Sequence, residues 1–192
     1  MGRLTGWFPV VLLAVLAALT FWLDRQVQSG DRARDGKLRH DPDYIAQNLA
    51  GTNIGPDGVA LYTLTAKSMV HYPDDDTTYV EAPKLVQFRP AGMTITATSK
   101  NATLSSNGDH VYLTGDVRLV RSAYENKSAL TVETTYLHVV AKDNFAETDR
   151  PVRIFDASTL TTAVGLEFNT ETHILKLHSN VRGQYAKPKR AQ

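Results

Sequence analysis

The chain has 192 residues, with 21 lysines and arginines against 20 aspartates and glutamates, and it contains no cysteine. A charge balance this close to zero disfavours nucleic-acid binding. The missing cysteines exclude disulfides, thiol nucleophiles and cysteine-ligated zinc. Apart from its first stretch, the chain is long enough for one domain with a closed core.

The first predicted element is an uncharged helix over residues 7–23. At about 1.5 Å per residue it would be roughly 26 Å long, which is the short end of a bilayer span. Trp7 and Trp22 suit the two membrane interfaces. A cleaved signal peptide would have small residues such as Ala-x-Ala after its apolar run, and Leu23 is not followed by them. We therefore predict an uncleaved transmembrane anchor, preceded by a short end of residues 1–6.

Residues 24–43 are rich in Arg, Asp, Gly and Gln and poor in apolar side chains, which is typical of a solvated linker. More basic residues follow the span, such as Arg25, Arg32 and Arg34, than precede it. The positive-inside rule, applied alone, would place the rest of the chain in the cytoplasm.

From Tyr44 onward, apolar and polar side chains alternate with a period of two, most clearly over residues 111–120. This period is typical of half-buried strands. Turn sequences such as Gly55–Gly58 and Ser106–Asp109 separate the runs. Only residues 43–49 allow a turn of helix. The pattern predicts an all-β domain over residues 44–186, either a sandwich, a barrel or a jelly roll, followed by a disordered basic tail of residues 187–192.

One phrase recurs four times in this region, at a spacing of roughly 30 residues. Each copy has an apolar residue, a turn-prone or Pro/Gly kink, and then an apolar residue beside a basic one. A unit repeated at this spacing usually stacks on copies of itself, so we expect a stacked β scaffold. The copies of this repeated phrase are Glu81–Val86, Leu113–Leu119, Thr148–Ile154 and Leu177–Arg182.

The residues that could carry chemistry are few. His71 lies near Asp74, Asp75 and Asp76, but the spacing fits no EF-hand loop, and a polar turn explains it as well. The histidines form no His-x-x-x-His pair, and no Gly-x-Ser-x-Gly elbow occurs. We predict no catalytic residue, no metal site and no cofactor. Paired carboxylates that converge in a cleft stay open, because strands bring distant residues together.

The apolar face of the strands has two interpretations, an ordinary filled core or an interior that holds a lipid. Exposing one CH₂ group to water costs about 0.8 kcal/mol, so an acyl chain crossing an aqueous gap needs a continuous apolar surface. The predicted lipid-binding residues on this face are Tyr62, Leu64, Val86, Phe88, Ile95, Leu113, Val117, Leu119 and Phe168.

The predicted span is followed by a series of segments whose order and spacing are specific, namely Asp41–Tyr44, Gly58–Ala66, His71–Asp75, Pro83–Leu85, Leu113–Val117 and Gly165–Asn169. Together they resemble the LptC family, the inner-membrane component of lipopolysaccharide export in Gram-negative bacteria. The resemblance covers nearly the whole chain.

The resemblance implies a twisted, open β jelly roll of antiparallel strands in the periplasm, preceded by one transmembrane helix in the inner membrane. The orientation that the resemblance implies is opposite to the one that the positive-inside rule alone predicts, and we adopt the orientation that the resemblance implies. It also implies a non-enzymatic protein that receives lipopolysaccharide from the membrane subunits of an ABC transporter (LptF/LptG-like) at its N-terminal edge. A periplasmic bridge protein (LptA-like) would dock at the C-terminal edge by strand addition.

Two glycines take a docking role in this interpretation, Gly58 near the N-terminal edge and Gly165 near the C-terminal edge. A glycine inside a strand often marks a bulge or a close approach of another backbone. Two rival functions remain, a membrane-anchored periplasmic enzyme acting on glycans and a structural adhesion domain with a filled core.

Overall fold

The computed structural model describes residues 7–30, 40–89, 92–140, 142–169, 171–172 and 174–186. The chain divides into two compact units, Met1–Asp41 and Pro42–Gln192. The predicted short end of residues 1–6, residues 31–39 of the predicted linker and the predicted tail of residues 187–192 lie outside the described residues.

The first unit contains the helix α1 (Phe8–Gly30). It continues past the predicted end at Leu23 and includes the charged residues Asp24 and Arg25. Within the described residues, no helix is both long enough and apolar enough to cross a membrane. The helix itself is confirmed, and its predicted crossing of a membrane is not.

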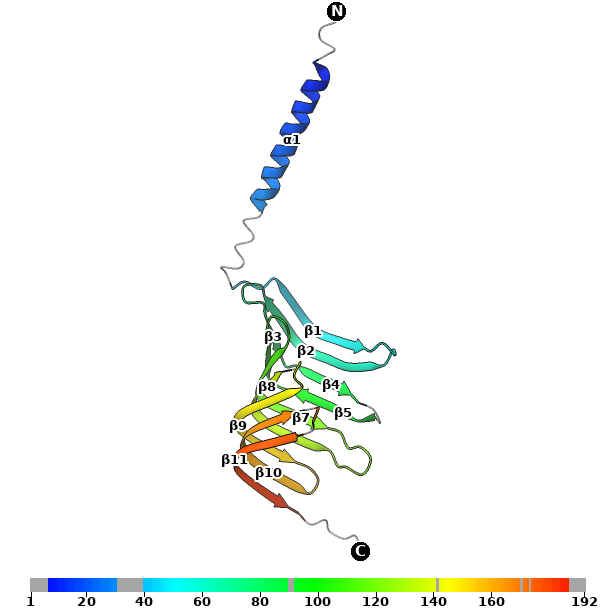
Figure 1. The fold of residues 1–192 in the computed structure, drawn as a ribbon, viewed down its shortest axis with the longest axis vertical. Helices are drawn as coiled ribbons and strands as arrows, with labels where there is room; N and C mark the ends of the chain where they lie inside the picture. The colour runs from blue at the N-terminus through cyan, green and yellow to red at the C-terminus, as the bar shows by residue number, and fades with distance from the viewer. Residues whose placement is uncertain are drawn as a thin grey trace, which may run out of the picture. The chain divides into compact units, whose positions relative to one another are not determined.

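The second unit is a single antiparallel sheet of eleven strands (Figure 1). Strand β1 occupies the segment in which the sequence allowed a helical turn, so that alternative is wrong. The strands are β1 (Tyr44–Ile54), β2 (Ala60–Tyr72), β3 (Thr77–Glu81), β4 (Lys84–Phe88), β5 (Thr94–Thr98), β6 (Asn101–Leu104), β7 (His110–Arg121), β8 (Leu130–Val140), β9 (Phe145–Phe155), β10 (Thr159–Asn169) and β11 (Ile174–Tyr185).

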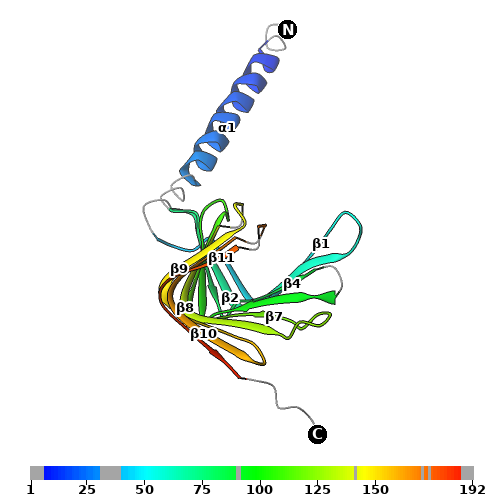
Figure 2. The same cartoon turned by 60° about the horizontal axis from the view of Figure 1, so that its bottom comes forward.

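The sheet is a meander if β3 with β4, and β5 with β6, are each counted as one broken strand. Strands β3 and β4 act as one broken strand beside β2, and they pair with β6 and β5 respectively. Strand β7 pairs with both β5 and β6 and then with β8. The order continues through β9 and β10 to β11, which curve around together in Figure 2. The prediction of an all-β antiparallel domain is confirmed.

A line of irregular residues crosses the sheet and divides the strands into two halves. Asn48, Ala82, Asp116 and Asn180 all have left-handed φ angles between 48° and 51°. The breaks of neighbouring strands lie side by side, because the N–H of Ala82 donates to the carbonyl of Lys100, and the N–H of Lys100 donates to the carbonyl of Gly115, each at 2.7 Å. We call this line the crease. Bulges of this kind bend strands and increase their twist.

The four copies of the repeated phrase lie where the crease crosses their strands. The breaks after Glu81, at Gly115–Asp116, after Thr148 and at Asn180 fall within its four copies. The expectation of units stacked on one another is therefore wrong. The phrase recurs because successive strands each need a bend at the same level of one sheet.

One face of the sheet is apolar and carries two core clusters. One cluster includes Val80, Leu113 and Leu137, and the other includes Val152 and Leu166. Burying a side chain of this size contributes about 1.5–3 kcal/mol. We call this side the inner face. Cross-strand partners lie on the same side of a sheet, so the inner face also carries the row Leu64, Leu85, Ala97, Leu119, Val132 and Ile154.

Candidate functional site

The inner face holds an apolar cavity of about 340 Å³ between strands β5 and β7–β11. Alternation along each strand brings its aliphatic side chains to this side, while the polar neighbours point to the opposite, outer face. Most of the cavity wall is made by aliphatic and aromatic side chains, among them Ile95, Leu119, Val132, Ile154, Phe168 and Leu175.

Four of the predicted lipid-binding residues line this cavity, namely Ile95, Val117, Leu119 and Phe168. Leu113 precedes the crease in β7 and does not line the cavity; it is buried in the core and pairs with Leu137.

Tyr62 and Leu64 lie on the same face, farther along the sheet on β2, outside the cavity lining. Tyr62 is 41% exposed. Six of the nine predicted residues therefore lie on the inner face, four of them in the cavity lining and two on β2. Leu113 is buried in the core.

Val86 and Phe88 do not belong to this face. Val86 pairs with Thr63 and Thr96, whereas the inner face passes through their neighbours Leu64 and Leu85. Phe88 has the same parity as Val86 and pairs with Thr94. The prediction that both residues face the interior is wrong because the left-handed residue Ala82, before Pro83, shifts the alternation by one position.

The two ends of the sheet are long, unpaired edges in the part of the chain that the structure describes. Strand β1 pairs only with β2, and strand β11 pairs only with β10. Both edges expose large apolar side chains, including Ile45 at 58%, Ile54 at 63%, Val181 at 53% and Tyr185 at 70%. Edges of this kind are templates for pairing with a strand of another protein.

Gly58 lies in the turn between β1 and β2, where its N–H donates to the carbonyl of Gly55 at 3.0 Å. Its φ is +77°, and a Cβ atom there would meet no atom within 4 Å. The left-handed turn accounts for this glycine.

Gly165 lies in β10, which has strand partners on both sides, so its backbone is not at the edge of the sheet. Its φ is +83°, and a Cβ atom would lie 2.7 Å from Nδ1 of His178 on β11. The crease and the close approach of β11 account for this glycine within the chain. A docking role for Gly58 or Gly165 stays a prediction.

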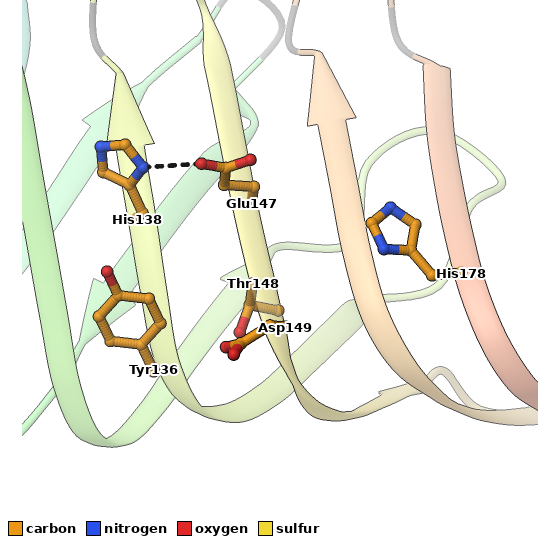
Figure 3. Close-up of a pocket in the computed structure, with 6 residues that line it drawn as sticks. All are labelled: Tyr136, His138, Glu147, Thr148, Asp149 and His178. Carbon is orange, nitrogen blue, oxygen red and sulfur yellow. Dashed lines mark hydrogen bonds and ion pairs between the residues drawn. The ribbon is translucent and has the colours of Figure 1, made fainter.

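A second, polar cavity of about 280 Å³ is lined by residues of β8, β9 and β11 (Figure 3). His138 points toward Glu147, with 2.9 Å between its Nδ1 and the carboxylate. The carboxylate of Glu167, the cross-strand partner of Glu147, lies 3.0 Å from Nε2 of His178. Burial raises the pKa of Tyr136, which also lines this cavity.

This polar cluster contains two carboxylates on neighbouring strands, the arrangement that a glycan-cleaving pair requires. Glu147 on β9 and Glu167 on β10 are direct cross-strand partners. Two like charges in this position repel one another unless cations lie nearby. Histidines and Lys176, 3.5 Å from Glu167, supply those partners. The arrangement explains the cluster as a charge-balanced ladder on the outer face.

Sequence reasoning missed two features. The ladder of Glu147 and Glu167 depends on strand register, which no local signal reveals. Arg121 also lines the apolar cavity, and this one could have been found, because Val117, Leu119 and Arg121 share one parity along β7.

The family model described as "Lipopolysaccharide-assembly, LptC-related" matches residues 10–186. A similar solved structure is that of LptH, the LptA homologous periplasmic component of the conserved lipopolysaccharide transport device from Pseudomonas aeruginosa. It is 9% identical, covers 78% of this chain and 98% of its own, and has a TM-score of 0.49. A comparison with curated proteins finds no match.

Proposed function

Because the chain belongs to the LptC-related family of lipopolysaccharide-assembly proteins, we propose that it takes lipopolysaccharide from the membrane subunits of an ABC transporter and passes it to a periplasmic bridge protein. A role in lipopolysaccharide transport without enzymatic activity follows from the family. The route of the lipid and the identity of both partners are the proposal.

The observation that carries the proposal is the apolar cavity on the inner face, lined by Leu119, Ile154 and Phe168. An acyl chain of about a dozen carbons costs roughly 10 kcal/mol when it is fully exposed to water. A chain lying in the cavity avoids much of this cost. The row from Leu64 through Leu85 to Leu119 extends the same apolar surface toward the N-terminal edge.

The two edges, unpaired among the described residues, support a path for the lipid from a partner at one end of the sheet to a different partner at the other end. A strand of the transporter would add to β1, and a strand of the bridge protein would add to β11, with main-chain hydrogen bonds forming each joint. Each edge strand has its own crease residue, Asn48 in β1 and Asn180 in β11. A partner strand with a matching bend would continue both halves of the sheet.

Attachment to the Gram-negative inner membrane is part of this proposal, with residues 7–23 as a single-pass anchor, residues 24–43 as a linker and residues 44–186 in the periplasm. The support is the uncharged sequence of residues 7–23 and the tryptophans at its two ends. The jelly-roll description of residues 44–186 belongs to the same proposal and is supported by the single creased sheet.

The test is to purify the full-length chain from a Gram-negative host and identify bound lipid by mass spectrometry. We expect lipopolysaccharide to copurify, Leu119→Lys to lose it, and the matched change Val120→Lys on the neighbouring outward position to retain it. An adhesion domain would bind no lipid. A glycan hydrolase would instead cleave glycans and lose that activity in Glu147→Gln.

A further inference from the structure

Arg121 is a cation on the wall of a cavity whose other lining residues are apolar except for two threonines. Its cross-strand partners on β5 and β8 are Ile95 and Leu130. Its Nη2 donates to the carbonyl of Ser128 at 2.8 Å. Its Nε is buried and has no hydrogen-bond partner among the described residues. An unsatisfied buried group of this kind costs free energy, and more when it carries charge, so it needs an explanation.

The turn after β7 adds a second cation beside Arg121. The ring of Tyr124 lies 5.4 Å from the guanidinium carbon of Arg121 and 5.2 Å from Nζ of Lys127. Lys127 also donates to the Tyr124 hydroxyl at 3.0 Å. Main-chain hydrogen bonds in both directions between Tyr124 and Lys127 hold this turn, and the exposed Glu125 lies at its tip.

Neither cation has a carboxylate partner in the described residues, although ion pairs are common on the outer face, as between Arg153 and Glu133 at 3.0 Å. Two cations against the single carboxylate of Glu125 leave this corner of the cavity positive. An apolar cavity with an unneutralised guanidinium at its wall favours an anionic amphiphile over a neutral one, because an anionic oxygen both accepts a charge-assisted hydrogen bond and neutralises the charge, whereas a neutral acceptor does only the first.

We propose that Arg121, assisted by Lys127, binds a phosphate of the transported lipopolysaccharide while the acyl chains lie against Leu119 and Ile154. Guanidinium binds phosphate oxygens with two parallel hydrogen bonds, for which lysine is a poor substitute. The inference rests on the proposed function and adds the group that is recognised. Arg121 thereby sets the position of the head group relative to the chains.

The experiment uses the full-length chain in phosphatidylcholine nanodiscs and two fluorescent probes, bisphosphorylated lipid A and the same lipid A after enzymatic removal of its phosphates. We expect Arg121→Gln to weaken binding of the phosphorylated probe about tenfold, the usual effect of one charge-assisted hydrogen bond. Binding of the dephosphorylated probe should not change. Arg121→Lys should retain part of the preference, and Arg118→Gln, on the outer face of the same strand, should change neither affinity.

The outcomes separate the two claims. If the unmodified chain binds both probes equally well, the phosphate site is wrong and the lipid-transport proposal survives. If Arg121→Gln lowers the affinity for both probes equally while the variant unfolds at the same temperature as the parent, Arg121 shapes the cavity and does not bind phosphate. If the unmodified chain binds neither probe, both claims fail.

Discussion

Val117 and Arg118 are consecutive in β7, yet they lie on opposite faces of the sheet. Val117 is 1% exposed in the core, whereas the side chain of Arg118 is 54% exposed and its Nε lies 3.8 Å from Glu133. The pair follows the crease at Gly115–Asp116. The repeated phrase therefore encodes a bend, followed by one apolar residue that points inward and one basic residue that points outward.

The same relationship holds across the sheet. Val152 and Arg153 follow the crease in β9 in the same way, with Val152 buried and Arg153 exposed. The basic residues of the phrase share the outer face because their strands are in register. This row is Lys84, Arg118, Arg153 and Arg182, linked through Thr98, Glu133 and Thr162.

The first prediction concerns the core. Leu137→Ala removes a side chain that is 2% exposed, and we expect it to lower the free energy of unfolding by about 2–5 kcal/mol. Leu175→Ala, at a position that is 44% exposed, should cost under about 1 kcal/mol. Denaturant titration of both variants measures the difference. Equal costs would mean that Leu137 is not part of a close-packed core.

The second prediction concerns Gly165. Both Gly165→Ala and Gly58→Ala impose a left-handed φ on alanine, at a cost of about 1 kcal/mol or more. Only at Gly165 does the new Cβ also meet His178, so this variant should be clearly the less stable of the two. Thermal unfolding compares the pair. A more stable Gly165→Ala would contradict the close approach of β11.

The third prediction concerns the two edges. Val181→Lys places a charge on β11 and should weaken capture of the bridge protein, while capture of the transporter stays unchanged. Ile45→Lys on β1 should do the reverse. Pull-downs with each partner measure both effects. Loss of both partners in either variant would show general unfolding or a single shared docking surface.

The fourth prediction concerns pH. The ring nitrogens of His71 donate hydrogen bonds to Asp43, at 2.7 Å, and to Asp76, at 3.0 Å, and these bonds raise the pKa of His71 above its ordinary 6.5. Because the folded chain favours protonated His71, its ion pairs are complete below pH 6.5 and are lost as pH rises through the raised pKa. His71 is also the strand partner of Tyr44 at the start of β1.

We therefore expect the amides of residues 44–47 to lose protection from hydrogen exchange as pH rises above 6.5 and through the raised pKa of His71, beyond the intrinsic increase in exchange rate. In His71→Gln this additional loss should disappear. The same pH dependence in both proteins would assign the effect to another group.

The strands of this domain are predictable from period-two alternation, since Val117, Leu119 and the residues between them follow it without interruption. Two things required the structure. Alternation does not continue across a left-handed residue, so the sequence pattern predicts the wrong face for Val86 and Phe88, which follow Ala82. Cross-strand neighbours such as Glu147 and Glu167 depend on register, which bulges reset at the crease.

The central claim is that acyl chains of lipopolysaccharide travel along the inner face. It is tested most directly by a photo-crosslinking amino acid placed in cells at Leu119, which lines the cavity, and in parallel at Arg118 and Phe88, which do not face it. The account predicts lipopolysaccharide adducts at Leu119 that depend on ATP hydrolysis by the transporter, and none at the other two positions. Adducts at Arg118 or Phe88 without adducts at Leu119 would contradict it.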